Sequence, residues 1–530
     1  MPEYQAPGVY VEAAGSGPRS IEGVDTGTAG FVGETERGPA RPCLLTGWSD
    51  YERCFGGYLD RPPFDRADRY LPYAVKGFFD NGGKRLWVAR AVGAAARCAA
   101  LDLGALRLEA LGEGDWGNRL IVAVKPARGG LAGAAPDWFR LEVAYYRDGV
   151  PAEAAFVDPT DSALFGNSAR VAPTAVEVFD DLSPRAGDAN FAASVINAGS
   201  YLVRVTFCSG RPDDAAFPRL HFAAGVSDPA QVAQYAGDPP VQPGQRRGLA
   251  ALLDIREIAL LAIPDDVAPG LGSLREALMQ SCEALKSAFA IVSAGPGLSD
   301  LGQVQVPRDS SYAAYYYPWV RVAAPHTGEG HRLVPPTGHV AGVYARVDAE
   351  RGVHKVPANE VLRGLDTGYF RSGRQALEVT LGSSEQALLT PRGVNLIRDF
   401  RRAGRGIRVW GGRTMSRDGL LKYVNIRRLF IYLEQSIDRG TAWVVFEPND
   451  DLLWARVRES VEGFLHAVWR GGALAGNTPD QAYIVRCDRS TMTQADIDAG
   501  RLICLIGVAP VKPAELVVFR IGQKTAVASA

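Results

Sequence analysis

The stretch "YVNIRRLFIYLEQSIDRG" at residues 423–440 decides the fold of the last third of the chain. Its apolar residues recur three and four positions apart, which is the spacing of one face of an α-helix. Gly440 follows the last of them and is a typical helix-ending residue. The stretch therefore predicts a helix with one buried stripe, made of Ile426, Leu429, Phe430, Leu433 and Ile437.

The residues that follow predict a C-terminal domain of mixed α and β structure. "TAWVVF" (441–446) is predicted to be a strand ended by Pro448, and "NDDLLWARVRESVEGFLHAVWRGG" (449–472) a second helix with Asn449 or Asp450 as its N-cap. Three more strands are expected in "AYIVRC", "RLICLIGVA" and "ELVVFRI". The order αβαβββ predicts a sheet with helices on one face.

Upstream, the pattern predicts an α/β domain interrupted by an insertion. A helix over 70–80 and a buried strand over 85–92 are followed by a β-rich stretch, and α/β character resumes near residue 245. The predicted fold class is thus multidomain α+β and α/β. The expected parts are an N-terminal arm (1–20), a discontinuous α/β domain (21–92 and 245–350), an inserted β-rich module (93–244), a C-terminal domain (351–510) and a C-terminal arm (511–530).

Both chain ends carry strand-like runs without an evident local partner. Val9, Tyr10 and Val11 precede a loose run of small residues, and a Pro-x-x-Pro kink precedes the run Leu516, Val517, Val518, Phe519 and Ile521. Such runs suggest strand addition onto neighbouring copies, and head-to-tail contacts of that kind build rings or filaments. Frayed ends, or arms that fold back within one chain, are equally open alternatives.

The charge, the cysteine content and the apolar runs of the chain limit which classes of protein it can belong to. The net charge of −1 gives the 530-residue chain no general attraction to nucleic acid or anionic membranes. The seven cysteines are scattered and contain no Cys-x-x-Cys, which argues against a disulfide framework and for a reducing cytoplasm. We see neither a signal peptide at the start nor an apolar run long enough to span a bilayer. We therefore expect folding in the cytosol.

Residues 392–428 form a basic segment, with eleven Lys and Arg against two Asp, an excess of nine. Three interpretations stay open: a solvated basic face, complementarity to acidic surfaces of a partner or a neighbouring copy, and nucleic-acid binding. The last lacks aromatic platforms for stacking bases. The residues we predict to make electrostatic contacts are Arg401, Arg402, Arg427 and Arg428, with Asp450 and Asp451 as acidic counterparts.

Catalytic chemistry finds little support in the sequence. Four histidines (His326, His331, His339 and His354) lie close together, but their spacing matches no metal-ligand pattern. The chain has no Gly-x-x-x-x-Gly-Lys-Ser/Thr loop and no Gly-x-Ser-x-Gly elbow. We expect no catalytic residue, metal or cofactor. The alternative is a histidine-dependent metal hydrolase that uses residues 326–354.

Several blocks resemble the tail sheath proteins of contractile phages and phage-tail-like contractile injection systems. The resemblance covers residues 1–92 and about 245–522. It is carried by "PGVYVEA" (7–13), "FFDNGGKRLWVARAV" (78–92), "YYYPWVRV" (315–322), "VPPTGHVAGVYARVDAERGVHKVPANEVLRG" (334–364), "GIRVWGGRTMS" (406–416), "YVNIRRLFIYLEQSID" (423–438) and "TAWVVFEPND" (441–450).

This resemblance implies a structural protein that polymerises around an inner tube and contracts to drive the tube through a target envelope. It implies that both arms join the C-terminal domains of neighbours into shared sheets, and that the inserted module faces outward. The implied partners are copies of itself, the inner tube protein, and the baseplate and tail terminator proteins. The protein would then be part of a phage tail or a released tail-like particle.

Overall fold

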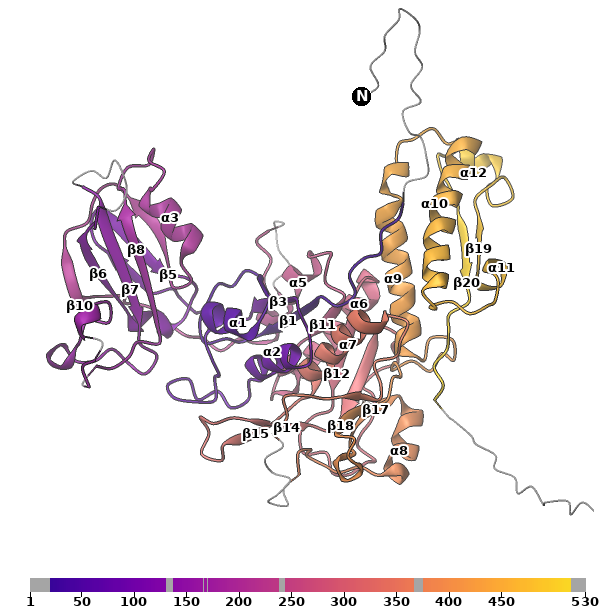
Figure 1. Ribbon diagram of the computed structural model, residues 1–530, viewed down its shortest axis with the longest axis horizontal. Coiled ribbons are helices and arrows are strands. Elements are labelled where there is room, and N and C mark those ends of the chain that lie inside the picture. The colour runs from indigo at the N-terminus through magenta and orange to yellow at the C-terminus, as the bar shows by residue number, and fades with distance from the viewer. Residues whose placement is uncertain are drawn as a thin grey trace, which may run out of the picture. The chain divides into compact units, whose positions relative to one another are not determined.

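The structure is a computed structural model that describes residues 20–129, 137–164, 166–168, 170–237, 244–366 and 375–515 (Figure 1). The chain divides into two compact units. The larger unit comprises residues 25–352 and 357–424. The smaller unit comprises residues 353–356 and the chain from 425 onward, together with the residues before 25.

A nine-stranded sheet forms the centre of the larger unit, in the order β16-β18-β17-β13-β12-β11-β1-β3-β2. The six strands from β17 to β3 run parallel, and antiparallel strands lie at both edges. Parallel strands covered on both faces require continuous apolar sequence, and every residue of β12 and β13 is buried. The strands are β1 (Ala29–Gly33), β2 (Cys43–Leu45), β3 (Leu86–Arg90), β11 (Leu260–Ala262), β12 (Phe289–Ser293), β13 (Ala313–Tyr317), β16 (Glu360–Val361), β17 (Val394–Asp399) and β18 (Ile407–Trp410).

The predicted helix over 70–80 is α2 (Leu71–Asp80), which packs closely against α7 (Thr337–Arg351). The helices can approach because Gly338 lies directly over the backbone of Ala74, where any Cβ would overlap the carbonyl oxygen. The imidazole of His339 lies against Gly77 in the same contact. Around the large sheet this unit also has α1 (Trp48–Phe55), α4 (Val232–Ala236), α5 (Gly248–Leu253), α6 (Ser273–Leu285) and α8 (Ser383–Leu389), and a hairpin joins β14 (Val320–Ala323) to β15 (His331–Val334).

The stretch expected to be β-rich holds two further sheets around one apolar core that includes Trp116 and Phe139. Glu36 attaches this part to the rest of the unit. Its buried carboxylate accepts a hydrogen bond from the Tyr145 hydroxyl (2.8 Å) and pairs with Arg147 (2.6 Å). The elements are β4 (Ala100–Asp102), β5 (Leu106–Ala110), β6 (Leu120–Pro126), β7 (Phe139–Tyr145), β8 (Ala175–Leu182), α3 (Ala192–Gly199), β9 (Val203–Cys208) and β10 (Ala215–His221).

In the smaller unit, both predicted long helices are present as α9 (Val424–Gly440) and α10 (Asp451–Arg470). Asp450 is the N-cap of α10, because its carboxylate accepts a hydrogen bond from the Leu453 backbone N–H at 2.8 Å. Leu429 and Leu433 of α9 share one core with the inward face of α10. The short elements are α11 (Pro479–Ala482), β19 (Tyr483–Arg486), α12 (Gln494–Asp498) and β20 (Leu505–Val508).

The prediction of a strand at 441–446 is wrong. Thr441 continues the helical hydrogen bonding to Ile437 (2.9 Å), and residues Ala442–Val444 form a 3-10 turn. These residues connect two packed helices, and no strand of the described chain pairs with them. The αβαβββ order therefore does not describe this unit, in which the described strands are β19 and β20.

The domain boundary expected at residue 351 also differs from the division in the structure. Residues 357–424 contribute β16, β17 and β18 to the nine-stranded sheet, so they belong to the larger unit. The arm residues Val9, Tyr10 and Val11 lie outside the described residues, as do Leu516, Val517, Val518, Phe519 and Ile521.

Candidate assembly surfaces

The sheet of the smaller unit has two strands and two open edges. β19 and β20 pair antiparallel, with Tyr483 opposite Val508 and Arg486 opposite Leu505. Along β19 and β20 themselves no other strand of the described chain pairs with either of them. Directly after β20, the Ala475 N–H donates to the Ala509 carbonyl oxygen (2.7 Å), so residues 473–475 cover the edge at that end. A two-stranded sheet is marginal alone, and this one is supported by the packing of β19 on α10.

The register shows which backbone groups face these open edges. The Ala509 N–H donates to the Ala482 carbonyl oxygen at 2.9 Å, which makes residues 482 and 509 a hydrogen-bonded pair. Hydrogen-bonded and non-hydrogen-bonded pairs alternate along an antiparallel ladder. The pairs 483/508 and 485/506 are therefore non-hydrogen-bonded, and their N–H and C=O groups point away from the partner strand. Each edge thus presents donors and acceptors suited to an added strand.

One face of this sheet is buried and the other is exposed to solvent. Val485 lies in the core beneath α10. On the opposite face, Ile484 and Leu505 are diagonal neighbours and both are exposed. Large apolar side chains exposed next to one another are typical of interaction sites.

A second apolar surface lies in the connection between α9 and α10. Val445 and Phe446 are exposed there, and Leu452 is exposed in the first turn of α10. Phe446 also has a left-handed backbone conformation (φ +72°), which is unfavourable for a bulky residue. The sequence analysis missed this surface because it assigned Val445 and Phe446 to a strand and did not single out Leu452.

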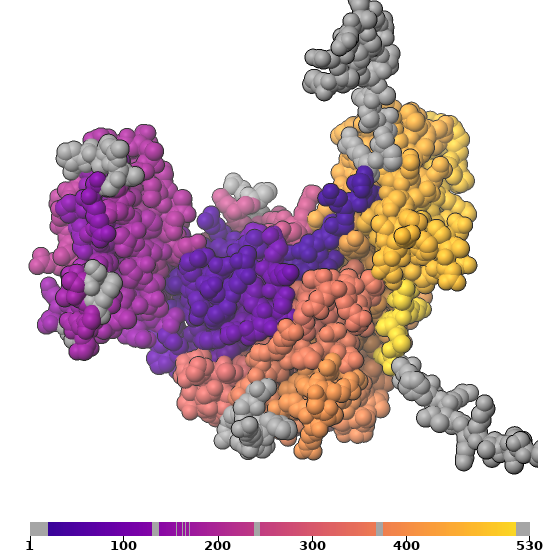
Figure 2. Space-filling view, viewed as in Figure 1, coloured from indigo at the N-terminus to yellow at the C-terminus, as the bar shows by residue number. Residues whose placement is uncertain are grey.

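The first and last described segments of the smaller unit, residues 20–24 and 511–515, lie toward opposite ends of α9 (Figure 1), and Figure 2 shows the same two segments in indigo and yellow. Near the start, the Val24 N–H donates to the Ser436 hydroxyl (3.1 Å) and Ile21 lies against Gly440, so this segment runs toward the C-terminal end of α9. Near the finish, the Asn425 side chain donates to the Val511 carbonyl oxygen (3.4 Å) at the N-terminal end of α9. The 17 residues of α9 span about 25 Å at about 1.5 Å per residue.

The predicted electrostatic contacts are distributed over both units. Arg401 forms an ion pair with Asp399 (2.6 Å) and Arg402 is exposed, both in the larger unit. Arg427 and Arg428 are only 9% and 3% exposed. They therefore present little charge to an external partner.

The two predicted acidic residues have local roles as well. Asp450 caps α10, as described above, and the exposed Asp451 pairs with Arg489 at 3.1 Å. Other cations of the basic segment also have partners within the chain, such as Arg408, which donates to the Asn359 carbonyl oxygen at 2.6 Å. The charge excess of this segment is thus partly satisfied inside the fold.

Two of the four clustered histidines, His326 and His339, occupy separate packing sites. His326 lies 2.7 Å from an Asp60 carboxylate oxygen and stacks on Tyr58, while burial lowers the pKa of His339 to about 4. Among the residues that the structure describes, no three His, Cys, Asp or Glu side chains are grouped as metal ligands. The hydrolase alternative therefore has no support from the arrangement of these histidines.

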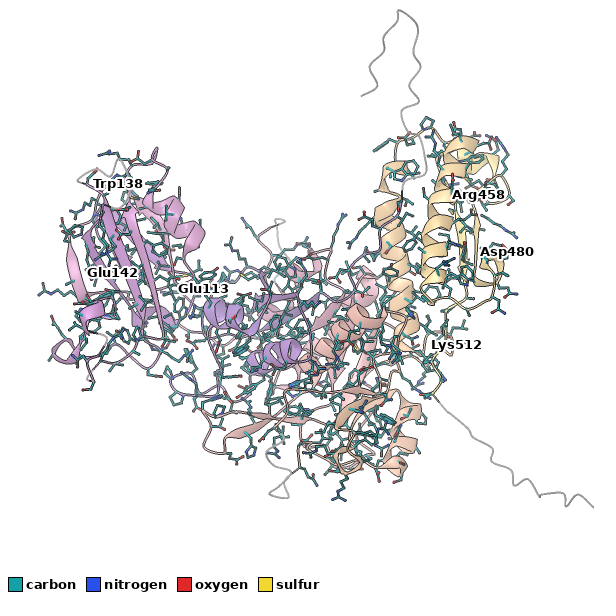
Figure 3. The ribbon with its side chains drawn as sticks, in the orientation of Figure 1. Glu113, Trp138, Glu142, Arg458, Asp480 and Lys512 are labelled. Carbon is teal, nitrogen blue, oxygen red and sulfur yellow. The ribbon has the colours of Figure 1, made fainter. Side chains whose placement is uncertain are left out.

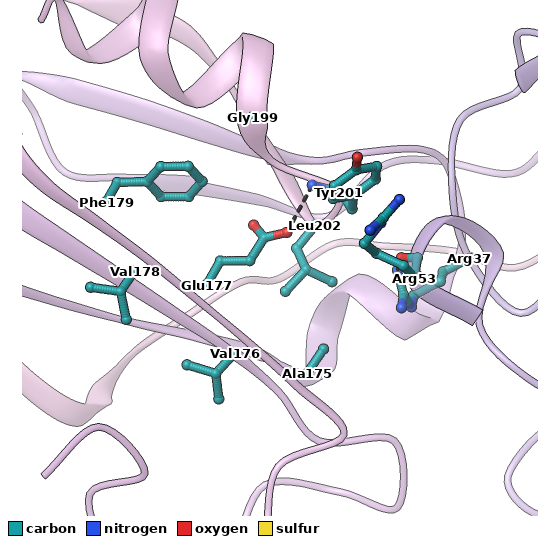
Figure 4. Close-up of a pocket in the computed structure, with 10 residues that line it drawn as sticks. All are labelled: Arg37, Arg53, Ala175, Val176, Glu177, Val178, Phe179, Gly199, Tyr201 and Leu202. Atoms are coloured by element: carbon teal, nitrogen blue, oxygen red, sulfur yellow. Dashed lines mark hydrogen bonds between the residues drawn. The ribbon is translucent and has the colours of Figure 1, made fainter. Parts of the chain in front are cut away.

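A pocket lies between the β-rich part and residues Arg37 and Arg53 of the same unit (Figure 4). Glu177 is its acidic group, and burial raises the pKa of this carboxyl. However, the carboxylate already accepts hydrogen bonds from the Tyr201 backbone N–H (2.8 Å) and the Ser200 hydroxyl (2.5 Å), and the Arg53 guanidinium lies over the Tyr201 ring. These contacts connect α1 to the neighbouring sheets. We therefore assign the polar groups of the pocket a structural role.

No helix in the described ranges combines the length and the apolar character needed to cross a lipid bilayer. Charged side chains are spread over both units, for example Glu113 and Glu142 in the larger and Arg458 and Asp480 in the smaller (Figure 3).

Comparison with known proteins identifies two family domains from residue 248 onward. Residues 248–415 match the phage tail sheath protein central domain, and residues 416–524 match the phage tail sheath C-terminal domain. Together these consecutive matches span more than half of the 530 residues.

Two curated relatives are tail sheath proteins. A putative prophage major tail sheath protein of Pseudomonas aeruginosa is 26% identical over 288 residues, which cover 52% of this chain and 69% of the relative. The tail sheath protein of Salmonella phage ViI is 28% identical over 204 residues, which cover 38% of this chain and 30% of that longer protein.

Solved structures show the same fold along nearly the whole chain. The helical sheath of the anti-feeding prophage in its contracted state matches with a TM-score of 0.57 at 23% identity, covering 98% of this chain and 100% of that one. The contracted sheath of an extracellular contractile injection system, PVC, matches with a TM-score of 0.56 at 20% identity, covering 99% of both chains. The mixed α/β multidomain fold is thus confirmed, and the protein belongs to the family of tail sheath proteins, the structural subunits of contractile phage tails and phage-tail-like contractile injection systems.

Proposed function

We propose that this protein polymerises into a sheath around an inner tube and that its terminal segments, 1–20 and 511–530, link the subunits. Each segment would add a strand to an open edge of the β19–β20 sheet in a neighbouring copy. The observation that carries this proposal is the two-stranded sheet with outward-pointing backbone groups on both edges.

The positions from which the two terminal segments start favour links to different neighbouring subunits. The described residues where these segments join the smaller unit, Ile21 and Val511, contact opposite ends of α9, a helix about 25 Å long. Residues 12–20 could span roughly 30 Å when extended, so the N-terminal arm has the reach to leave its own unit. Two arms that depart in this way make head-to-tail contacts, which build rings or helical filaments.

Main-chain links on tethers suit a lattice that must contract. A backbone hydrogen bond contributes about 0.5–1.5 kcal/mol net, and a sheath repeats such bonds in every subunit. The units between the links can then rotate as rigid bodies while the links stay intact. The contraction energy would be stored in the packing of unit surfaces, without nucleotide hydrolysis.

The remaining assignments are also proposals. The β-rich part within 93–244 would face outward, away from the tube. The exposed Arg402 is the strongest of the predicted electrostatic contacts with the tube or an adjacent subunit, whereas Arg427 and Arg428 are buried. The inner tube protein, the baseplate and the tail terminator would be the partners, with assembly in the cytoplasm before the particle is released.

Deletion of residues 1–12 tests the linking role. The variant should purify as a folded monomer with an unchanged far-UV circular dichroism spectrum, and coexpression with the tube protein should give bare tubes in negative-stain electron microscopy. An Arg402→Glu variant of the full chain separately tests the charge contact. Sheaths of normal length from the deletion would refute arm exchange, whereas a monomer that does not fold would show that the arm belongs to its own unit.

A further inference from the structure

Two cysteines lie opposite each other at the end of the β19–β20 ladder. Cys487 directly follows β19 and Cys504 directly precedes β20, and the last pair of the ladder is Arg486 with Leu505. Continuing the antiparallel register by one residue pairs Cys487 with Cys504. By the alternation described above, this is a non-hydrogen-bonded pair, in which Cα atoms are about 4.5 Å apart. That separation lies within the range of disulfide bonds, about 4.4–6.8 Å.

The side chains also lie on the same face. Cys487 is two residues from the buried Val485, so both point into the core beneath α10, and Cys504 packs against the same cluster. Cys487 is only 1% exposed, whereas Cys504 is half-buried. Both are free thiols.

The two thiols also influence each other's ionisation. The interaction with Cys487 lowers the pKa of Cys504, and the interaction with Cys504 together with burial raises the pKa of Cys487. Cys504 is therefore both the more accessible sulfur and the more easily ionised one. These are the properties of an attacking thiol, with Cys487 placed to resolve the product.

We propose that Cys487 and Cys504 are a redox-sensitive thiol pair that closes to an intrachain disulfide when the protein meets a small-molecule disulfide such as oxidised glutathione. The Cys504 thiolate attacks one sulfur of the oxidant, forming a mixed disulfide and releasing one thiol. Cys487 then loses its proton to solvent and attacks the Cys504 sulfur, which releases the second thiol. The pair loses two electrons and two protons, and the oxidant is reduced to two thiols.

The other five cysteines lack this arrangement. All seven lie in the described chain, and only Cys487 and Cys504 occupy facing positions at the ends of paired strands. Cys282, for example, is fully buried in α6. A reducing cytoplasm keeps the pair open, and a particle released into an oxidising environment would close it.

The bond would hold β19 and β20 in register at one end without occupying their outer edges. It closes a loop over residues 488–503, which contain α12. Because a cross-link restricts the unfolded chain, the closed form should resist denaturants better. The chemistry needs only the folded smaller unit, so its failure and the failure of sheath assembly are distinguishable.

The test uses the purified full chain. Fully reduced protein is incubated with oxidised glutathione, the remaining thiols are blocked with iodoacetamide, and the protein is digested with trypsin. Cleavage after Arg486, Arg489, Arg501 and Arg520, but not before Pro513, should give residues 487–489 linked to residues 502–520, two hydrogens lighter than the separate reduced peptides. The five other cysteines should be alkylated.

A second measurement compares urea unfolding of the oxidised and reduced chains. The midpoint should rise on oxidation in the wild type and in Cys208→Ala, and this rise should be lost in Cys504→Ala. Alkylation of both Cys487 and Cys504 after oxidation, or glutathione retained on Cys504, would overturn the proposal. The peptide mapping uses the wild-type chain, so it decides the matter even if Cys504→Ala folds poorly.

Discussion

Replacing Ile506 with proline tests whether the outer edge of β20 accepts a strand. Ile506 is opposite Val485 in a non-hydrogen-bonded pair, so its N–H points away from β19. Proline removes that N–H and is tolerated on edge strands where the N–H would face solvent. We therefore expect Ile506→Pro to fold and to lose one outward donor.

The expected weakening of the contact between subunits follows from the one hydrogen bond that is removed. One backbone hydrogen bond contributes about 0.5–1.5 kcal/mol, which corresponds to a roughly two- to tenfold weaker contact in each subunit. Because the same contact repeats along a sheath, this loss is multiplied in a polymer and should shorten or abolish sheaths. Ile506 is 38% exposed, so Ile506→Ala serves as the control for the lost side chain with the N–H retained.

Leu505→Pro provides the opposite control. Leu505 belongs to a hydrogen-bonded pair with Arg486, so proline there removes a bond inside the ladder. The melting temperature of Leu505→Pro should fall clearly below that of Ile506→Pro. The melting temperature of Ile506→Pro should stay close to that of Ile506→Ala.

Assembly with the tube protein is scored by sedimentation and electron microscopy. If Ile506→Pro assembles as well as Ile506→Ala, the β20 edge accepts no strand. If it unfolds as readily as Leu505→Pro, our assignment of inward and outward groups is incorrect.

Three further predictions concern the fold. Asp450→Ala should destabilise the protein by about 1 kcal/mol through loss of the α10 cap, whereas the exposed Asp451→Ala should change the unfolding free energy by less than about 0.5 kcal/mol in urea titrations. Gly338→Ala should lower the melting temperature, because the added methyl group overlaps the Ala74 carbonyl oxygen and forces α2 and α7 apart, at a cost of about 1–3 kcal/mol. An unchanged melting temperature would contradict this close helix contact. The pKa of His339 is about 4 in the folded protein and near 6.5 in the unfolded chain, so the unfolded chain takes up the proton first as the pH falls. About 3 kcal/mol of folding stability should therefore be lost between pH 6.5 and pH 4, and His339→Gln should abolish this part of the pH dependence.

The sequence by itself determined the elements whose signals are local. The apolar spacing in 423–440 and 449–472 predicted α9 and α10, and Asp450 was one of two predicted caps. Helix periodicity and capping involve residues within a few positions of one another, so they can be recognised without the rest of the fold. The collinear blocks that indicated the family are likewise a property of the sequence alone.

Tertiary structure decided the features that depend on a distant partner. "TAWVVF" has strand-like composition, but it connects two packed helices and pairs with no strand in the part of the chain that the structure describes. It therefore forms a turn that exposes Phe446. Residues 394–410 joined the large sheet because β13 offers an edge there, and the arginines at 427 and 428 lost their exposure through packing. The pairing of Cys487 with Cys504 needed the register of β19 and β20, two strands that are separated by the 18 residues 487–504. A strand gains its hydrogen bonds from another segment, and composition alone does not say which segment that is.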